Sequence, residues 1–249
     1  MVMMMYTHIR LLAVCQMAGP DLSIVLEDAM ADMEGRFTRT VRIPRRAVSE
    51  GVLLPIMESP WPGFEPQDQY PVTATVKVSH DGRNLNLLYH VVEPELRRMC
   101  TCHNSEIWTD SCVEMFLANP AVNEKEYVNF EFSASTYALV GRGSGRPGRI
   151  LYDAQKIDTL PIEFRLQRNT ATFEGMESGS EWTLSVSIPL AEFGLAVPGE
   201  DIGGLQLKGN FYKCGDGLTR PHYLMWNPVD TAKPEFHSPQ CFGILDLEE

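Results

Sequence analysis

The segment Ile107–Leu117 (IWTDSCVEMFL) places a tryptophan and two carboxylates at alternate positions. Successive side chains of an extended strand point to opposite faces, so residues two apart share a side. The even-numbered face therefore carries Trp108, Asp110 and Glu114. The odd-numbered face is apolar and typical of a core, with Val113, Met115 and Leu117. Burial poorly explains a large aromatic ring beside acids on the opposite face, which indicates a ligand surface.

Carbohydrate recognition is the chemistry that this combination suits best. The indole ring of Trp108 offers a flat apolar surface whose electron-rich face attracts the slightly positive C–H groups of a pyranose. The carboxylate of Glu114 can accept hydrogen bonds from two neighbouring sugar hydroxyls, and its charge strengthens those bonds. The periodicity alone also allows a second interpretation, in which Trp108 anchors the start of the strand in a second layer of packing.

A second stretch, Lys208–Asp230 (KGNFYKCGDGLTRPHYLMWNPVD), gathers amide, amine and aromatic side chains near the chain end. Asn210 and Lys213 can donate hydrogen bonds, and Trp226 supplies another flat ring. A packed aromatic hairpin is the alternative interpretation of the same residues.

Taken together, these segments resemble the carbohydrate-binding module family 9-like proteins. The resemblance rests on seven stretches in order: Trp61–Pro66, Trp108–Glu114, Tyr127–Phe132, Gly209–Asp216, Trp226–Pro228, Pro234–Pro239 and Phe242–Leu247. It implies a non-catalytic β-sandwich of polysaccharide utilisation that clamps a terminal pyranose of a mono- or oligosaccharide between Trp108 and Trp226. The same resemblance makes Glu114 the ligand-binding acid, and Asn210 and Lys213 further polar contacts.

Two further features of the family are implied without an assigned residue. One is an arginine contact. Ser133–Tyr137 contains no arginine, whereas Arg142 and Arg146 lie in the basic stretch Gly141–Arg149, which we expect to be a flexible loop. The other is a structural calcium ion, for which the sequence shows no dense Asp/Asn loop of the calcium-binding type. Calcium therefore stays an implied ion without assigned ligands.

The elements that must position these residues are predicted to be short strands. Alternating runs predict strands over residues 72–79, 84–91, 112–117, 127–133, 182–188, 205–212 and 242–247. The first two form a hairpin around Asp81-Gly82. Pro189–Phe193 is predicted to be a single helical turn, and the proline-rich residues 55–71 an extended segment. Many short strands without alternating helices predict an all-β fold, an antiparallel β-sandwich of the jelly-roll type.

The N-terminal part is predicted to be an extension of this domain. Residues 21–34 carry apolar side chains at helical spacing, with Asp21 placed to cap the start and Gly35 to end the helix. We expect this short amphipathic helix to pack outside the sandwich. The chain is therefore divided into an extension, residues 1–40, and a carbohydrate-binding sandwich, residues 41–249.

Composition argues against several partners. The net charge of −12 repels phosphate backbones and anionic lipid, so nucleic acid and membrane surfaces are not expected as partners. No run reaches eighteen apolar residues, so no membrane span is expected. Leu11–Cys15 only faintly resembles a lipoprotein cleavage site, because Val14 stands where a small residue is expected. A cytoplasmic location is slightly favoured over export.

The six cysteines lack paired spacing and predict no disulfide framework. Their irregular positions are typical of reduced, mostly buried thiols. Cys100 and Cys102, with the adjacent His103, leave a metal-binding alternative open.

Three other functions compete with sugar binding. A glycoside hydrolase needs two carboxyl groups roughly 5–10 Å apart, whereas Asp110 and Glu114 lie about 13 Å apart along a strand. Other acids brought together in space keep a hydrolase, or an accessory domain of one, open. A haem protein would draw axial ligands from Met and from His80, His90 or His222. A purely structural interaction domain is the third alternative.

Overall fold

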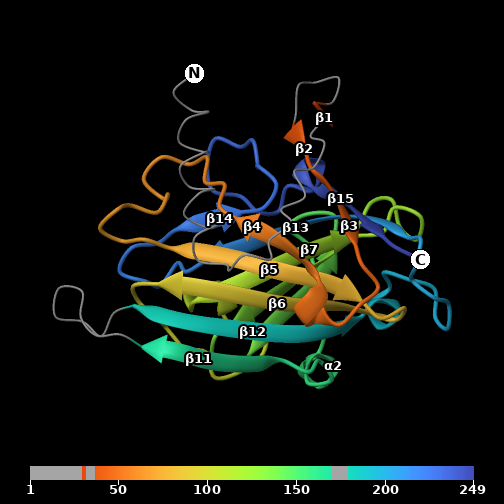
Figure 1. Cartoon of the computed structure of the whole chain (residues 1–249), viewed down its shortest axis with the longest axis horizontal. Helices are drawn as coiled ribbons and strands as arrows, with labels where there is room; N and C mark the ends of the chain where they lie inside the picture. The colour runs from red at the N-terminus through yellow and green to blue at the C-terminus, as the bar shows by residue number, and fades with distance from the viewer. Residues whose placement is uncertain (1–29, 32–36, 170–178) are drawn as a thin grey trace.

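The computed structural model describes residues 30–31, 37–169 and 179–249. Two large β-sheets stack against each other and form most of this fold, and the helical segments are short (Figure 1). The described part of the chain is therefore an all-β sandwich, as the alternating runs predict.

The larger sheet has eight strands. Its order is β10 (Ile150–Leu151), β9 (Ala138–Gly143), β8 (Tyr127–Ser133), β7 (Cys112–Ala118), β13 (Gln206–Cys214), β15 (Gly243–Leu247) and β3 (Thr40–Ile43), and β14 (Tyr223–Met225) pairs with β13 beside this path. Neighbouring strands run antiparallel except β15 and β3, which are parallel. The three central strands β8, β7 and β13 carry most of the residues that the sequence singles out.

The smaller sheet has five strands. Its order is β11 (Glu163–Asn169), β12 (Ser180–Pro189), β6 (Asn84–Glu93), β5 (Thr73–His80) and β4 (Val52–Ile56). β5 and β6 form the predicted hairpin, and the Asp81 carboxylate accepts hydrogen bonds from the amides of Arg83 and Asn84 at 3.0 and 2.7 Å. Pro55 lies in β4 at the sheet edge, where its missing N–H need not break a ladder bond.

The remaining elements are small. They are the paired β1 (Met30–Ala31) and β2 (Phe37–Thr38), the single turns η1 (Val48–Glu50), η2 (Ile107–Thr109), η3 (Leu190–Phe193) and η4 (Pro239–Cys241), and the short helix α2 (Ala154–Ile157). The helix predicted over residues 21–34 falls outside the described residues except at Met30 and Ala31. Those two residues lie in β1, so the prediction of helix is wrong there.

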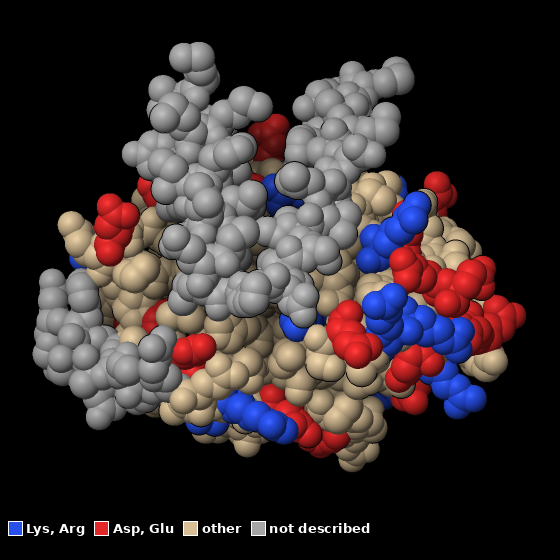
Figure 2. All heavy atoms as spheres, in the orientation of Figure 1, with Lys and Arg blue, Asp and Glu red and all other residues tan. Residues whose placement is uncertain are grey.

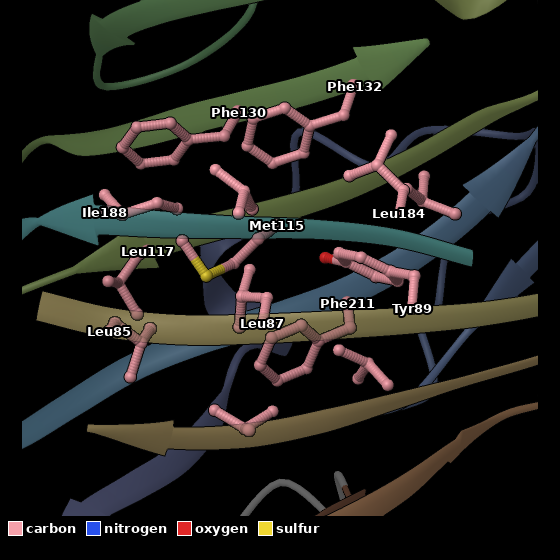
Figure 3. Close-up of a cluster of buried hydrophobic side chains, with 14 of the residues drawn as sticks. Leu85, Leu87, Tyr89, Met115, Leu117, Phe130, Phe132, Leu184, Ile188 and Phe211 are labelled. Carbon is pink, nitrogen blue, oxygen red and sulfur yellow. The ribbon is translucent and has the colours of Figure 1, made fainter. Parts of the chain in front are cut away.

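The core lies between the two large sheets. Figure 3 shows side chains from both sheets meeting there: Leu85, Leu87, Tyr89, Leu184 and Ile188 from the smaller sheet, and Met115, Leu117, Phe130, Phe132 and Phe211 from the larger. The contributing residues alternate along each strand, as a sheet with one face in the core requires. The Tyr89 hydroxyl also donates a hydrogen bond to the backbone carbonyl of Glu114 at 3.0 Å, so the core fixes β7 where it carries this acid.

Most of the strands predicted from alternation are confirmed. β5, β6, β7, β8, β12, β13 and β15 coincide with the predicted runs to within three residues at each end, and η3 confirms the helical turn after β12. The alternation did not identify β3, β4, β9, β10, β11 or β14.

The surface carries charges of both signs. On the face seen in Figure 2, lysine and arginine side chains are interspersed with aspartate and glutamate. The described residues visible there form no basic stripe of the kind that follows a phosphate backbone. Within the described ranges, no helix is long and apolar enough to span a bilayer.

Candidate functional site

The outer face of the larger sheet, opposite the core, carries the polar residues of its central strands. The strand register aligns Tyr212, Glu114 and Glu131 in one row, and Cys214, Cys112 and Ser133 in the next. The predicted parity of β7 is confirmed, because its apolar odd-numbered residues enter the core while Cys112 and Phe116 belong to a separate outer cluster. The sheet therefore presents acids and thiols to the loops that cover it.

These loops leave a pocket of about 370 Å³ over the sheet. Glu114, Glu131 and Cys214 line it from the sheet, and we call these three residues the floor. The covering loops and β14 supply the rest of the lining, namely Trp108, Arg146, Arg149, Asp216, Tyr223, Pro234, Glu235, Phe236 and His237. The pocket thus brings Trp108 together with Glu114, two of the five residues predicted to bind a ligand.

Trp108 is held at the pocket by the turn that follows β13. It lies in η2, one turn before β7, and not in the strand that the sequence predicts. Its carbonyl accepts a hydrogen bond from the Asp216 amide at 3.0 Å, and the Thr109 carbonyl accepts one from Gly217 at 3.0 Å. The partly exposed ring of Trp108 is therefore anchored through its backbone and remains accessible on the pocket side.

Asp110 has a structural role, and the residues that line the pocket do not include it. It is fully buried and accepts hydrogen bonds from the Met99 and Cys100 amides at 2.8 and 3.0 Å and from the Ser133 hydroxyl at 2.6 Å. Burial alone would raise the pKa of Asp110, but these hydrogen bonds outweigh it and lower the pKa. Asp110 thus stays ionised and ties the loop before η2 to β8.

The two acids of the floor are cross-strand neighbours on β7 and β8. Glu114 and Glu131 are each 3% exposed. Burial raises the pKa of Glu114 well above its usual range, and the adjacent Glu131 raises it further. Burial raises the pKa of Glu131 to about 7, against the opposing effect of Arg149. Near neutral pH the pair therefore retains a proton, so it can donate as well as accept hydrogen bonds.

Two arginines reach the pocket from the segment between β9 and β10. Arg149 Nη1 lies 3.5 Å from Glu131 Oε1, and Arg146 Nε lies 3.8 Å from Glu235 Oε1. Arg142, the other arginine considered from the sequence, instead forms an ion pair with Glu126 at 2.8 Å. The sequence reasoning missed Arg149. The hairpin of β9 and β10 brings Arg149 to the pocket. The sequence feature that could have indicated this position is the glycine-rich turn between the two short strands.

Tyr223, Phe236 and His237 contribute rings to the lining from a later stretch of the chain. Tyr223 of β14 is partly exposed and lines the pocket together with Asp216. Phe236 stacks on Tyr212 with ring centroids 4.1 Å apart. The Tyr127 hydroxyl and His237 Nδ1 form a hydrogen bond of 2.6 Å. Burial, followed by the charges of Arg149 and Arg146, lowers the pKa of His237 to about 3, so its ring is neutral.

Trp226 occupies the core, contrary to the expectation that its ring would face Trp108 across a cleft. It is 1% exposed, packs edge-on against Phe211 at 5.9 Å, and closely approaches Gly243, whose missing side chain leaves room for the indole. The reason is strand parity. Leu224 and Trp226 point to the core, whereas Tyr223 belongs to the outer cluster. The two-tryptophan clamp is therefore not confirmed.

Lys213 also points away from the pocket. On β13 it pairs with Val113, a core-facing position, and it is fully buried. Its Nζ lies 2.8 Å from Glu93 Oε2 on the smaller sheet and also donates to the Cys214 carbonyl at 2.8 Å. An ion pair between the two sheets accounts for this lysine, and the expectation of a ligand contact is not supported by its position.

Asn210 lies on the outer face of β13, but its side chain is committed to the backbone. Its amide donates to the Asn227 carbonyl at 2.8 Å, and its Oδ1 accepts from the amides of Asn227 and Phe211 at 2.8 and 2.9 Å. It is fully buried and is not among the residues that line the pocket. Asn210 therefore fixes the segment that follows β14.

The described residues bear on two expectations, that the cysteines form no disulfides and that calcium is bound. Cys100, Cys102, Cys112, Cys214 and Cys241 are free thiols, and Cys15 lies outside the described residues. Within the described ranges, one cluster has ligand atoms close enough for a metal ion: Cys112, Glu114 and Cys214. Calcium takes six to eight hard oxygen ligands, so a cluster with two soft thiols does not fit it.

Comparison with known proteins agrees with this geometry. The model of carbohydrate-binding family 9 matches residues 56–247. A Bacteroides uniformis ATCC 8492 protein, provisionally assigned to carbohydrate binding, has a solved structure with 26% identity and a TM-score of 0.71. The match covers 85% of this chain and 100% of that one.

More distant matches include a family 9 carbohydrate-binding module from Caldicellulosiruptor kristjanssonii. Its complex with cellotriose gives 14% identity, a TM-score of 0.47 and coverage of 84% of this chain and 94% of that one. Its complex with glucose gives 13% identity, a TM-score of 0.49 and coverage of 84% of this chain and 96% of that one. A search of the curated proteins gave no match.

Proposed function

This chain belongs to carbohydrate-binding family 9, and from that membership we propose that it binds a sugar without catalysis in the pocket over the outer face of the larger sheet. The observation that carries the proposal is the partly exposed Trp108 in one pocket with Glu114, Glu131 and Asp216. A flat ring beside several hydrogen-bonding acids suits a pyranose, which is apolar above and below its ring and polar around its edge.

We assign the second aromatic surface of the site to Tyr223 and not to Trp226. Tyr223 is partly exposed and lines the same pocket as Trp108, whereas Trp226 is 1% exposed in the core. A tyrosine offers a flat ring for stacking and a hydroxyl for hydrogen bonding. The sugar would thus be contacted by one tryptophan and one tyrosine supplied by η2 and β14.

The polar side chains of the pocket would form hydrogen bonds with the hydroxyl groups around the sugar ring. Glu114 and Glu131 together offer carboxylate oxygens and a retained proton, so they suit hydroxyls that donate and accept at once. Arg146 and Arg149 add donors that cannot lose their protons. Both arginines lie within 4 Å of an acid of the pocket, so their donors are oriented before a ligand arrives.

A glycoside hydrolase is the second candidate, because the pocket contains a close pair of acids. Glycosidases use one protonated acid and one ionised carboxylate that acts as base or nucleophile. Here burial raises the pKa of both Glu114 and Glu131, and the pair retains a proton near neutral pH, so the pocket could offer one acid and one carboxylate. Membership of a binding family is what favours a non-catalytic site.

The proposal is tested by titration calorimetry with a panel of mono- and disaccharides. The wild type should bind at least one of them, and Trp108→Ala should lose detectable heat. Leu166→Ala, which truncates an exposed residue on β11 of the smaller sheet, is the matched control and should bind like wild type. Equal binding by Trp108→Ala and wild type would reject the site. Release of reducing sugar from oligosaccharides would instead support the hydrolase.

A further inference from the structure

At the pocket floor, Glu114 and Cys214 lie beside a second thiol, Cys112, on the same face of the sheet. Cys112 on β7 and Cys214 on β13 are direct cross-strand partners, and Glu114 lies two residues along β7 on the same face. One ligand atom from each of the three residues lies within 4.8 Å of the other two. Cys214 Sγ lies 3.0 Å from Glu114 Oε1, and Cys112 Sγ lies 4.0 Å from it.

Among the described residues, no Lys, Arg or His nitrogen forms an ion pair with the carboxyl group of this cluster, and Arg146 acts on it only from a greater distance. Glu114 is 3% exposed, and the hydrogen bonds to its side chain come from the two thiols. The arginines of the pocket lie within ion-pair distance of other acids, Arg149 of Glu131 and Arg146 of Glu235. Buried carboxylates are normally paired with a cation or coordinate a metal ion. A cation that displaced the proton retained by the acid pair would therefore lie next to two thiols.

We propose that Cys112, Glu114 and Cys214 form a binding site for a thiophilic divalent cation such as Zn²⁺. Zinc binds thiolate sulfur at about 2.3 Å and carboxylate oxygen at about 2.0–2.2 Å in tetrahedral geometry. Those lengths require separations of about 3.5–3.8 Å between ligand atoms. The two sulfur–oxygen separations of 3.0 and 4.0 Å bracket this range, and the two sulfurs lie within 4.8 Å of each other, so side-chain rotations at three adjacent residues can bring the ligand atoms to these lengths.

The site has three protein ligands and one open position. Glu114 and Cys214 line the pocket, so the pocket is both the route by which the cation enters and the space into which the fourth position opens. On binding, each thiol releases its proton to solvent and supplies the thiolate lone pair to the cation, and Glu114 likewise gives up any proton that it holds to ligate as a carboxylate, so binding weakens as the pH falls. The fourth ligand is water or an oxygen of a molecule in the pocket.

This site is independent of sugar recognition, although both use Glu114. A metal signal arises from the sulfur–metal bonds and is read without any sugar present. Failure of sugar binding would leave the metal proposal untouched, and the reverse also holds.

The test is a titration of the reduced protein with Co²⁺, which reports thiolate ligation through a sulfur-to-cobalt charge-transfer band in the near ultraviolet. We expect one Co²⁺ per chain and displacement of the band by Zn²⁺. Cys112→Ser and Cys214→Ser should each weaken binding by roughly 100-fold or more, because a hydroxyl is a far poorer ligand. Cys100→Ser and Cys102→Ser, which alter accessible thiols outside the cluster, are matched controls and should bind like wild type.

The proposal is overturned if millimolar Co²⁺ produces no such band, or if the band survives in both cluster variants. A second measurement covers the case in which those variants fail to fold. In a time course long enough for opening of the fold to expose buried thiols, Zn²⁺ should slow the alkylation of Cys112 and Cys214 of the wild type, read residue by residue by mass spectrometry, and leave the rates at Cys100 and Cys102 unchanged. Equal measurable rates at Cys112 and Cys214 with and without Zn²⁺ would also reject the site, as would finding the two joined in a disulfide after reduction and handling under nitrogen.

Discussion

The two tryptophans that the sequence singles out serve opposite purposes in the fold. Trp108 is partly exposed at the pocket and is held through its backbone, whereas Trp226 is 1% exposed and packs beneath the sheet against Phe211. Removing the first ring should mainly alter a surface, while removing the second leaves a cavity in the core. Replacement of Trp108 should therefore affect binding, and replacement of Trp226 should affect stability.

We predict that Trp226→Ala lowers the free energy of unfolding by about 3–5 kcal/mol, since a fully buried ring is lost. Trp108→Ala should lower it by less than about 1 kcal/mol. Urea unfolding of the two variants and wild type measures both values. Comparable losses in the two variants would mean that Trp108 is also a packing residue.

His237 makes stability depend on pH. Burial and the two arginines lower its folded pKa from 6.5 to about 3, so the unfolded chain takes up a proton that the folded chain refuses. The associated stability is present above pH 6.5 and is lost as the pH falls towards 3. Wild type should therefore lose about 1–2 kcal/mol more than His237→Gln between pH 7 and pH 5.

Parallel urea titrations at pH 7 and pH 5 measure this difference. Comparing the two proteins cancels the opposing contributions of Glu114 and Glu131, whose raised pKa values favour the folded state as the pH falls. Identical losses in wild type and His237→Gln would show that this histidine does not resist protonation.

At the scale of elements, alternation was informative wherever one face of a strand enters the core. It identified β7 and its core face because large apolar side chains recur at every second position of Cys112–Ala118, with Glu114 on the other face. The same rule, applied to β14, would have separated Tyr223 from Trp226 and turned the tryptophan inward. Applied to β13, it would have placed Lys213 with the core-facing Phe211.

Other features of the site had weaker sequence signals. β9, β10 and β14 are short or glycine-containing, so their alternation is weak. The position of Arg149 depends on the pairing of β9 with β10, and the meeting of Glu114 with Glu131 depends on the register of β7 and β8. Long-range pairing of this kind is not encoded in any local pattern.

The ion pair between β6 and β13 gives an element-scale prediction. Lys213→Met leaves the carboxylate of Glu93 buried without its cation, and we expect a loss of about 3–5 kcal/mol. Adding Glu93→Gln removes that charge while keeping an acceptor for the Trp182 indole N–H, which lies 2.8 Å from Glu93. The double variant should recover much of the loss in a double-mutant cycle of urea unfolding. Strictly additive effects would contradict the pair.

At the scale of the whole molecule, the sandwich separates two tasks between the faces of one sheet. The inner face packs against the smaller sheet, and the outer face supports loops that enclose the pocket. Because the loops pack on their own apolar cluster, the pocket can vary without disturbing the main core. We therefore expect variants of the pocket residues to fold with nearly unchanged free energies of unfolding.

The free thiols give a prediction for the whole chain. Thiol titration of denatured, non-reduced protein in the presence of a chelator should find at least the five described cysteines reactive. The physical reason is that their positions form no set of bridged pairs in the described fold. Detection of only one or two reactive thiols would contradict the structure and favour an oxidised protein.

The most direct test of the central claim is a crystal structure of the protein with the best sugar from the calorimetric screen. We predict one pyranose ring in the pocket, with its face on Trp108 and its hydroxyls hydrogen-bonded to Glu114 or Glu131. A sugar bound elsewhere on the surface, with this pocket filled by solvent alone, would contradict it.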